Sequence, residues 1–222
     1  MDAVGSEPMR LSLNGVRQVV VIGAHCDDIE IAAGATLLSL ASPDLRVHYV
    51  VCAGSPQRHA EAVTAAHAFV PGAQLSFGLH DLPDGRLPGH WAEVKQIIED
   101  AAAVLPQADL VLSPWRGDAH QDHRLLGELA PTAFRNALHL QYEIPKWDGD
   151  LGRPNLYLPV SSELARRKAE LLDKCFPSQH GRDWWSEETF LSLMKLRGIE
   201  CRSPYAEAFH VNKAVMELTP TA

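Results

Sequence analysis

Short, continuous runs of apolar and β-branched residues recur along the first half of this chain. The first run, Gln18 to Ile22, reads QVVVI and is closed by Gly23. Such runs, without regular polar alternation, are typical of strands that are buried on both faces. Three later runs have the same character and also end near a glycine or a proline: Arg46 to Cys52, Gln74 to Phe77 and Asp109 to Ser113. A sheet built from these strands needs helices on both of its faces.

The segments between these runs carry helical signals. Three segments rich in alanine and other helix-forming residues end before a proline or glycine: Ile29 to Leu40, Arg58 to Phe69 and Trp91 to Leu105. The segment from His80 to Gly89 holds two prolines and two glycines, so we expect a loop. Strand and helix alternate four times, with connections too long for hairpins, which predicts right-handed βαβ units. The expected fold class is therefore α/β, with a mainly parallel sheet and helices on both faces.

The second half of the chain continues this pattern less regularly. We expect a helix from Asp122 to about Asn136, bent or ended near Pro131. Further strands and helices are expected at Gln141 to Ile144, Asn155 to Val160, Ser162 to Cys175, Glu187 to Arg197 and Glu207 to Val211. No internal repeat, low-complexity tract or linker interrupts the chain. Residues 1–222 are therefore expected to form one domain, with residues 1–15 as a loose polar leader.

Composition and charge exclude several classes of function. With 222 residues, 46% of them hydrophobic, the chain is long enough to bury a full core. The net charge is −8 and the lysines and arginines form no basic stripe, which argues against a nucleic-acid partner. No apolar run reaches the roughly 18 to 20 residues of a membrane span, and no secretion signal is recognised. Four cysteines lie far apart, which predicts reduced thiols and a cytoplasmic protein: Cys26, Cys52, Cys175 and Cys201.

Two short segments combine histidine with aspartate. The first is Ala24 to Glu30 (AHCDDIE), and the second is Gly117 to His123 (GDAHQDH). His25 lies just beyond the first predicted strand, and His120 lies a few residues beyond the fourth. Because ligands of open α/β sheets bind outside the carboxyl ends of the strands, we expect both segments at one edge of the sheet. Histidine and carboxylate are ligand types that suit a borderline metal such as Zn²⁺.

Each segment also has a purely structural explanation. Asp27 or Asp28 can serve as the N-cap of the following helix, and Asp122 has the same alternative. The neighbouring histidines exceed what capping requires, and five or six candidates are present for the three protein ligands of a catalytic zinc site. The surplus suits metal-assisted hydrolysis. That chemistry needs a carboxylate to take a proton from water, an imidazole to stabilise the oxyanion or protonate the amine, and a carboxylate to orient the imidazole.

At these residues the chain resembles the PIG-L/LmbE family of zinc-dependent sugar de-N-acetylases. The first family signature, Ala-His-Pro-Asp-Asp-Glu before a glycine-rich helix start, stands here as Ala24 to Glu30. The second, His-x-Asp-His, stands as His120 to His123, and the Arg-x-x-Glu-Ala helix start between them stands as Arg58 to Ala62. The likeness covers about residues 18–134. It is looser beyond Leu138, chiefly at Ser178 to Gln179 and Tyr205 to Phe209.

The resemblance implies a Rossmann-like fold and a role for each motif residue. Three residues would bind the metal: His25, Asp28 and His123. Asp27 would be the general base, and His120 would be a charged imidazole that Asp122 orients. Arg58 would face the sugar. The metal would be Zn²⁺, although Fe²⁺ and Co²⁺ accept the same ligands.

Some residues depart from the family pattern or are weaker candidates. Cys26 replaces the usual proline, which loosens the turn slightly because proline fixes φ. Ile29 shifts the usual glutamate by one position to Glu30, and we expect this to alter only the support of the site. Asp84 is a candidate for binding sugar hydroxyls, with loop solvation as the alternative. Trp115 is a candidate for stacking on a sugar ring, with half-buried packing as the alternative.

These patterns lead to one main hypothesis. We expect a metal-dependent hydrolase that removes the acetyl group from a small-molecule N-acetylated amino sugar or glycoconjugate. An amidase acting on a thiol-linked or lipid-linked sugar conjugate and a non-catalytic sugar-binding protein remain as alternatives. A dinucleotide-binding protein is disfavoured, because Gly23 to Cys26 stands where G-x-G-x-x-G would begin. The sequence leaves the sugar, the native metal and the oligomeric state open, and a homo-oligomer is compatible with it.

Overall fold

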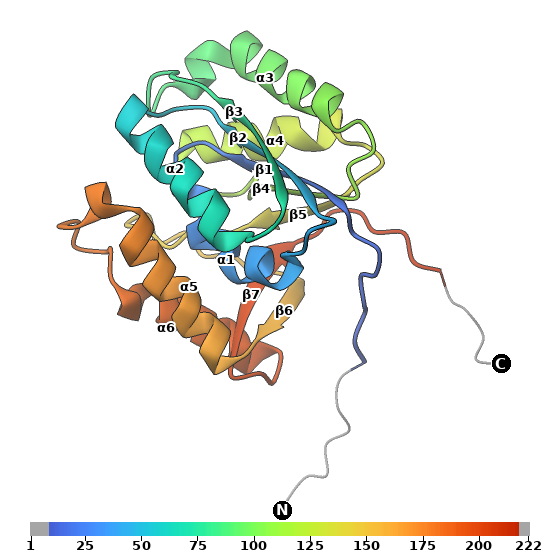
Figure 1. Ribbon diagram of the computed structural model, residues 1–222, viewed down its shortest axis with the longest axis vertical. Helices are drawn as coiled ribbons and strands as arrows, with labels where there is room; N and C mark the ends of the chain where they lie inside the picture. The colour runs from blue at the N-terminus through green and yellow to red at the C-terminus, as the bar shows by residue number, and fades with distance from the viewer. Residues whose placement is uncertain (1–8, 218–222) are drawn as a thin grey trace, which may run out of the picture.

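One sheet holds the seven strands found in residues 9–217, the part of the chain that the computed structural model describes (Figure 1). The strands are β1 (Gln18–Gly23), β2 (Arg46–Val51), β3 (Gln74–Leu79), β4 (Leu110–Pro114), β5 (Leu138–Tyr142), β6 (Leu156–Val160) and β7 (Tyr205–His210). Their order across the sheet is β3-β2-β1-β4-β5-β7-β6. Strand β7 alone runs against its neighbours β5 and β6. The predicted α/β class with a mainly parallel sheet is confirmed.

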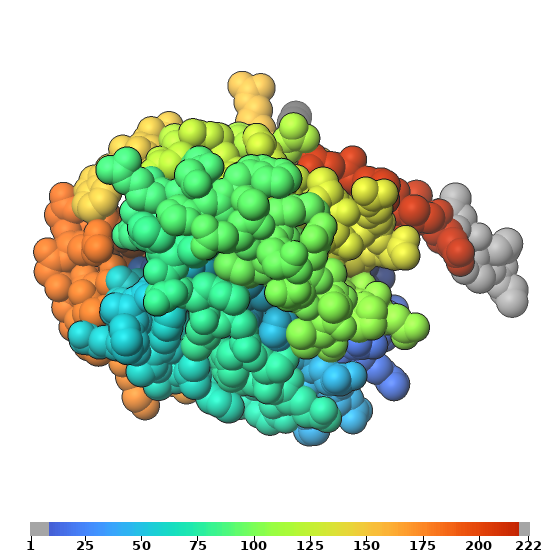
Figure 2. Space-filling model, turned by 90° about the horizontal axis from the view of Figure 1, so that it is seen from above, coloured from blue at the N-terminus to red at the C-terminus, as the bar shows by residue number. Residues whose placement is uncertain are grey.

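Helices cover both faces of the sheet (Figure 1). One face carries α1 (Asp28–Leu40), α2 (Pro56–Phe69), α5 (Ser162–Cys175) and α6 (Glu187–Glu200), and the other carries α3 (Trp91–Val104) and α4 (Gln121–Ala133). Two short 3₁₀ helices, η1 (Leu87–His90) and η2 (Pro177–Gln179), lie in connecting segments. From the α3 side, the green side chains of α3 and its flanking segments cover much of this face (Figure 2).

Alternate side chains of the buried strands face opposite layers of helices. In β1, Val19 and Val21 pack into the core beside α1, α2 and α5. Val20 and Ile22 pack into the core beside α3 and α4. All four side chains are fully buried. Because successive residues of a strand point to opposite faces, a strand covered on both sides must be apolar throughout, which is why QVVVI shows no polar alternation.

Most predicted element bounds agree with the structure within two or three residues. The strand expected at Gln141 to Ile144 lies instead at Leu138–Tyr142, because pairing with β4 begins where Leu138 lies opposite Leu110. The strand expected from Glu207 begins at Tyr205, opposite Val160 of β6. Residues 1–8 of the expected N-terminal leader lie outside the described residues, and residues 9–15 have no helix or strand.

Helix α4 continues through Pro131 to Ala133. A proline has no N–H, so the carbonyl oxygen of Gly127, four residues earlier, lacks its usual helical donor. The side-chain Nε2 of Gln141, buried in β5, donates to that oxygen at 2.7 Å. A side chain from the sheet therefore replaces the missing hydrogen bond, and the helix does not end at the proline.

Helix α1 is interrupted at Ala33, where φ is −127° and ψ is 20°. Just beyond the interruption, the N–H groups of Ala35 and Thr36 donate to the carboxylate of Glu207 in β7, at 2.8 and 2.7 Å. Lys168 of α5 donates to the same carboxylate at 2.6 Å. Both charged side chains are almost fully buried. This ion pair therefore fixes α1 to α5 and to the sheet.

The order of the strands reverses at β1 and β4. The chain moves from β1 outward to β2 and β3, then returns to β4 on the other side of β1. Helix α1 follows β1 on one face, and α4 follows β4 on the other. Such a reversal opens a crevice beyond the carboxyl ends of the two strands. Both histidine-containing segments follow these strands, so the predicted meeting of the two at one edge of the sheet is confirmed.

Two further observations concern membrane spans and cysteine pairing. Among the described residues, no helix is both long enough and apolar enough to cross a bilayer. All four cysteines are free thiols.

Candidate active site

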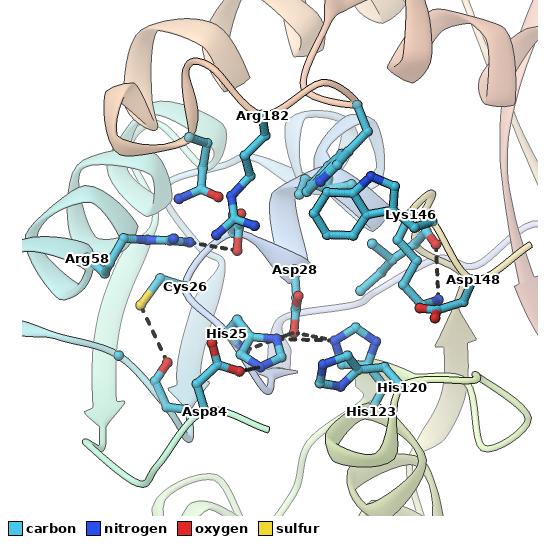
Figure 3. Close-up of a pocket in the computed structure, with 18 of the residues that line it drawn as sticks. His25, Cys26, Asp28, Arg58, Asp84, His120, His123, Lys146, Asp148 and Arg182 are labelled. Atoms are coloured by element: carbon cyan, nitrogen blue, oxygen red, sulfur yellow. Dashed lines mark hydrogen bonds and ion pairs between the residues drawn. The ribbon is translucent and has the colours of Figure 1, made fainter. Parts of the chain in front are cut away.

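The loops after β1 and β4 bring three potential ligand atoms together. Nδ1 of His25 lies 3.5 Å from Oδ2 of Asp28. Nε2 of His123 lies 3.3 Å from that oxygen and 3.3 Å from Nδ1 of His25 (Figure 3). Oδ2 of Asp28 also accepts hydrogen bonds from the backbone N–H groups of Ala24 and His25. These bonds turn the carboxylate back toward the end of β1 and fix it between the two imidazoles.

These separations match those that a single metal ion requires. In a tetrahedral site with bonds of about 2.0–2.1 Å, ligand atoms lie roughly 3.3 Å apart. The three observed separations are 3.3 to 3.5 Å. Two imidazoles and one carboxylate form a donor set that Zn²⁺, Fe²⁺ and Co²⁺ all accept. His25, Asp28 and His123 therefore fit a metal ion with three protein ligands and room for a fourth.

Carboxylates around the two imidazoles favour their charged forms in the metal-free protein. Burial lowers the pKa of His123, but the carboxylates of Asp28 and Asp118 outweigh it and raise that pKa to about 9. The pKa of His25 is also raised against burial, by Asp28 and Asp122. Burial raises the pKa of Asp28, yet the two histidines hold it well below its usual value. Metal ligands must be deprotonated, so an ion entering this cluster displaces protons.

Asp27 occupies the N-cap position of α1 but makes no side-chain capping hydrogen bond. Its carboxylate lines the cavity, with Oδ1 lying 2.8 Å from Nη2 of Arg58. Burial raises the pKa of Asp27, and the charge of Arg58 opposes this. A buried carboxylate with a raised pKa is suited to accept a proton near neutral pH. Helix capping therefore does not account for Asp27.

Glu61 connects Arg58 to a distant loop. Its Oε2 lies 3.5 Å from Nε of Arg58, one helical turn earlier in α2. The same carboxylate accepts hydrogen bonds from the backbone N–H of Ser178, at 2.9 Å, and from the Ser178 hydroxyl. This contact holds η2, whose residue Gln179 lines the cavity. The sequence signal for Glu61 is its place in the Arg-x-x-Glu-Ala segment, but its partner in η2 lies far along the chain.

The second motif differs from the expected arrangement. The ring of His120 caps α4, because its Nδ1 accepts a hydrogen bond from the N–H of Asp122 at 3.3 Å. The buried carboxylate of Asp122 accepts instead from the N–H groups of Gly85 and Leu87, at 2.7 and 3.0 Å. Burial and the charges of the neighbouring histidines lower the pKa of His120. The lowered pKa favours the neutral form of His120, and in that form the capping bond to Nδ1 leaves the ring proton on Nε2. The Asp122 carboxylate binds backbone N–H groups instead of this ring.

A buried network that the sequence analysis missed lies behind His123. Oδ2 of Asp118 lies 3.1 Å from Nδ1 of His123 and 2.9 Å from Nζ of Lys146. Lys146 also pairs with Asp150 at 2.8 Å, and Asp150 accepts from the N–H of Ala119. A carboxylate on the outer nitrogen fixes the tautomer and orientation of a metal-binding imidazole. Asp118 lies within the second motif, whereas no sequence pattern connects Lys146 to it.

An open cavity of about 430 Å³ lies over the three potential ligands (Figure 3). Arg58 and Asp84, two of the three predicted substrate contacts, line it. The third, Trp115, does not: its ring stacks on His210, with 4.2 Å between the ring centroids, and lies outside the residues that line the cavity. Half-buried packing, the alternative stated for Trp115, describes its position.

Part of the cavity wall comes from the second half of the chain. Seven of the lining residues belong to this half: Ile144, Lys146, Trp147, Asp148, Gln179, Arg182 and Trp184. The rings of the two tryptophans meet edge to face, with 6.0 Å between their centroids. Arg182 points into the cavity on the same side as Arg58 (Figure 3). The cavity thus offers aromatic faces and guanidinium groups near the ligand cluster.

Cys26, which stands in place of the usual proline, turns away from the ligand cluster. Its Sγ lies 3.8 Å from the carbonyl oxygen of Ala53. Burial raises the pKa of this thiol to about 12, so it stays protonated at neutral pH. Gly54 makes room for it, because a Cβ at that position would lie 2.5 Å from Sγ. The thiol therefore faces Ala53 and not the ligand cluster.

A family comparison identifies the matched half of the chain. The model of the PIG-L family, described as GlcNAc-PI de-N-acetylase, matches residues 20–134. This chain belongs to the PIG-L family. The match contains both histidine-containing motifs and the Arg58 segment between them. No curated protein matches the chain in sequence.

Solved structures share the fold of this PIG-L protein. The conserved protein TT1542 from Thermus thermophilus is 18% identical with a TM-score of 0.70, and the match covers 93% of this chain and 99% of that one. The N,N'-diacetylchitobiose deacetylase from Pyrococcus horikoshii is 20% identical with a TM-score of 0.66, over 88% of this chain and 83% of its own. GalB from Pseudomonas putida, a 4-carboxy-2-hydroxymuconate hydratase, is 17% identical with a TM-score of 0.69, over 92% and 100%.

At these identities the likeness shows the fold alone. The fold serves a deacetylase in one of these proteins and a hydratase in another, so it does not decide the reaction. The family match ends at residue 134. The wall formed by Lys146, Trp147, Gln179, Arg182 and Trp184 therefore lies beyond the part of the chain that the family model matches.

Proposed function

We propose that this PIG-L protein is a metal-dependent hydrolase that removes the N-acetyl group from an N-acetylated amino sugar or its conjugate. One observation carries the proposal. Three ligand atoms from two separate loops lie at the spacing of a single metal ion, and a carboxylate that caps nothing, Asp27, stands beside them in an open cavity. Family membership and the diacetylchitobiose deacetylase of the same fold support an amide of an amino sugar as the substrate.

The metal is held by His25, Asp28 and His123 in this proposal. When bound there, Zn²⁺, or Fe²⁺ or Co²⁺ in its place, supplies a Lewis acid that polarises the amide carbonyl and lowers the pKa of water. Asp118 keeps the lone pair of His123 Nε2 directed at this position through its bond to Nδ1. The backbone N–H groups at the end of β1 hold Asp28 in the same way.

Asp27 is the general base. Burial raises the pKa of Asp27 toward neutral pH, which makes its carboxylate a better proton acceptor. The contact with Arg58 at 2.8 Å fixes the direction of that carboxylate. Asp27 takes a proton from the attacking water and passes it to the departing nitrogen, so that acetate and a free amino sugar result. His120 donates a hydrogen bond from Nε2 to the carbonyl oxygen as that oxygen gains negative charge. The hydrogen bond that Nδ1 accepts from the N–H of Asp122 keeps the ring proton on Nε2.

The remaining lining residues bind the rest of the substrate. Arg58 and Asp84 are placed to donate to and accept from sugar hydroxyls, and Trp147 and Trp184 offer apolar faces for a sugar ring or an aglycone. Asp122 acts indirectly: its carboxylate accepts hydrogen bonds from the N–H groups of Gly85 and Leu87 and so positions the loop that carries Asp84. We also propose that the whole chain acts as one catalytic domain, because residues from both its halves line the cavity.

The test replaces Asp27 by asparagine and by alanine and measures acetate release from N-acetylated substrates. Removal of the general base is expected to lower kcat by about 10²- to 10⁴-fold while the metal content is unchanged. Asp44→Asn, at an exposed turn outside the cavity lining, is the matched control and keeps the wild-type rate. Activity near the wild-type level in both Asp27 variants would refute the assignment.

A substrate panel separates the alternatives. It holds N-acetylglucosamine, N,N'-diacetylchitobiose, a thiol-linked glycoside and a lipid-linked glycoside. Hydrolysis of only a conjugate identifies an amidase of narrower specificity. Metal-free protein that releases acetate from none of these substrates, even after zinc is added, would favour the non-catalytic sugar-binding alternative.

A further inference from the structure

Three cationic side chains line the cavity, and two of them are paired with carboxylates. Arg58 lies 2.8 Å from Asp27, and Lys146 lies 2.9 Å from Asp118. The third, Arg182, belongs to the loop between η2 and α6. Among residues 9–217, no carboxylate lies within 4.0 Å of its guanidinium group, and no other group forms a hydrogen bond with it. Arg182 is therefore a cation at the cavity that the described part of the chain does not neutralise by a direct contact.

The backbone of Arg182 is anchored, although the residue is exposed. Its N–H donates to the carbonyl oxygen of Gln179 at 3.2 Å, and its own carbonyl oxygen accepts from the N–H of Trp185 at 3.1 Å. The side chains of Gln179 and Trp185 are both buried. The guanidinium group therefore reaches into the cavity from a fixed position, as Figure 3 shows.

Two acidic side chains on the same part of the chain do not pair with Arg182. Asp183, the next residue, accepts a hydrogen bond from Nε1 of Trp147 at 3.0 Å instead. Asp148 lines the cavity on the side of Lys146, whereas Arg182 points in from another side (Figure 3). The charge of Arg182 is thus left facing the cavity although carboxylates are present in the loops around it.

A second guanidinium group lies on the same side of the cavity as Arg182 (Figure 3). It belongs to Arg58, which faces Asp27 with Nη2 and Glu61 with Nε, so that Nη1 is left as a donor. Two cations directed into one space repel each other, and an anion between them removes that repulsion. The net charge of the whole chain is −8, so its overall field repels anions, and a local cationic wall is needed to hold one. The fork of N–H groups on a guanidinium matches the oxygens of a carboxylate or a phosphate.

We propose that Arg182, with Nη1 of Arg58 beside it, binds a negatively charged phosphate or carboxylate group that the substrate carries in addition to its N-acetyl group. This inference rests on the proposed function and names the substrate class: an anionic amino-sugar conjugate, which Arg182 selects over the neutral sugar. The cavity of about 430 Å³ is within the size range of small-molecule sites, so it accommodates a sugar ring with a charged substituent. Arg182 lies beyond residues 20–134, which the family model matches, so this selectivity comes from the second half of the chain.

Calorimetric binding to the zinc-loaded protein tests this proposal. The ligands are glucosamine, glucosamine 1-phosphate and muramic acid, which have no acetyl group to lose and differ in their anionic group. At least one anionic ligand is expected to bind wild-type protein more tightly than glucosamine, and the tighter of the two identifies phosphate or carboxylate as the group. Arg182→Gln is expected to weaken binding of that ligand by about 10- to 100-fold, as for the loss of a charged hydrogen bond, and to leave glucosamine binding unchanged.

Two further variants show whether charge alone explains the effect. Arg182→Lys keeps the charge but not the fork of donors, so it is expected to retain only part of the preference for the anionic ligand. Arg153→Gln removes the same charge from an exposed position outside the cavity lining and is the matched control. It is expected to bind all three ligands like the wild type.

Two outcomes overturn the proposal. One is that neither anionic ligand binds wild-type protein more tightly than glucosamine. The other is a preference that persists unchanged in Arg182→Gln, since the anion would then bind elsewhere. Acetate release from the N-acetylated forms of the same ligands adds a kinetic readout: Arg182→Gln raises KM for the anionic substrate and changes kcat little, because the anionic group is remote from the reacting amide. A preference that Arg182→Gln abolishes, without acetate release from any substrate, supports the anion site and refutes the proposed function.

Discussion

Replacing Asp118 tests whether the carboxylate behind His123 controls metal binding. Asp118 and His123 are both almost fully buried, and their contact is 3.1 Å. Asparagine keeps the size of the side chain and one acceptor oxygen but removes the charge. Lys146 stays paired with Asp150 at 2.8 Å, so the substitution leaves no unpaired buried cation. The change therefore acts mainly on the imidazole and not on the stability of the loop.

The size of the effect follows from the role of the contact. Loss of an outer partner of a metal-binding histidine typically costs about 10- to 100-fold in metal affinity, or about 1.4–2.7 kcal/mol. Because asparagine still accepts the Nδ1 proton, Asp118→Asn is expected near the tenfold end and Asp118→Ala near the hundredfold end. Asp118 is also one of the two carboxylates that raise the pKa of His123 to about 9. Its removal weakens proton competition, so the full loss of affinity appears only above pH 9.

Zinc affinity is measured by competition with a chromophoric chelator at pH 7 and above pH 9, and acetate release is normalised to bound zinc. Asp148→Asn is the matched control, because Asp148 is exposed and lines the same cavity. Its zinc affinity is expected to equal that of the wild type. An affinity within about twofold of wild type for both Asp118 variants above pH 9 would contradict the reasoning, since no outer-partner effect of the usual size would remain.

Three further predictions follow from buried contacts. Lys168→Met leaves Glu207 as an unpaired buried charge, which costs about 3–5 kcal/mol and is expected to lower Tm by roughly 6–20 °C. The double variant with Glu207→Gln is expected to recover part of this loss. Equal Tm values for the wild type and Lys168→Met would contradict the prediction. Gln141→Leu removes the side-chain donor to the α4 carbonyl and is expected to lower the free energy of unfolding, measured in urea, by about 1–3 kcal/mol. Adding Pro131→Ala restores a backbone donor to that carbonyl and is expected to recover most of this stability. No recovery in the double variant would show that Gln141 does not replace the missing helical hydrogen bond. Because the pKa of His123 is raised to about 9, its ring is protonated below pH 9, and this proton must leave before a metal binds. Zinc affinity is therefore expected to rise roughly tenfold per pH unit, for each proton displaced, between about pH 6.5 and 8.5. A zinc affinity that does not change with pH would contradict this.

The sequence alone determined the architecture. The all-apolar run Gln18 to Ile22 and the alternation of strands with helices require a sheet that is covered on both faces, and this sheet is observed. Burial of a strand on two faces and the periodicity of a helix are local properties, and the pattern of about ten consecutive residues is enough to recognise them. Because ligands of such sheets bind beyond the carboxyl ends of the strands, the sequence also predicted that His25 and His123 lie at one edge of the sheet. Pro131 shows the limit of such local rules, because a side chain of β5 donates the hydrogen bond that the proline lacks and the helix continues past it.

Only the tertiary structure decided which side chain each motif residue contacts. Asp122 stands two residues from His120, yet its carboxylate binds the backbone 37 and 35 positions away. Asp118 meets Lys146, 28 positions distant, and Trp115 stacks on His210 rather than facing the cavity. A sequence pattern states which residues are buried or turn the chain, because these depend on near neighbours. Partners, charge states and cavity walls depend on distances between remote segments, and those distances exist only after the sheet has assembled.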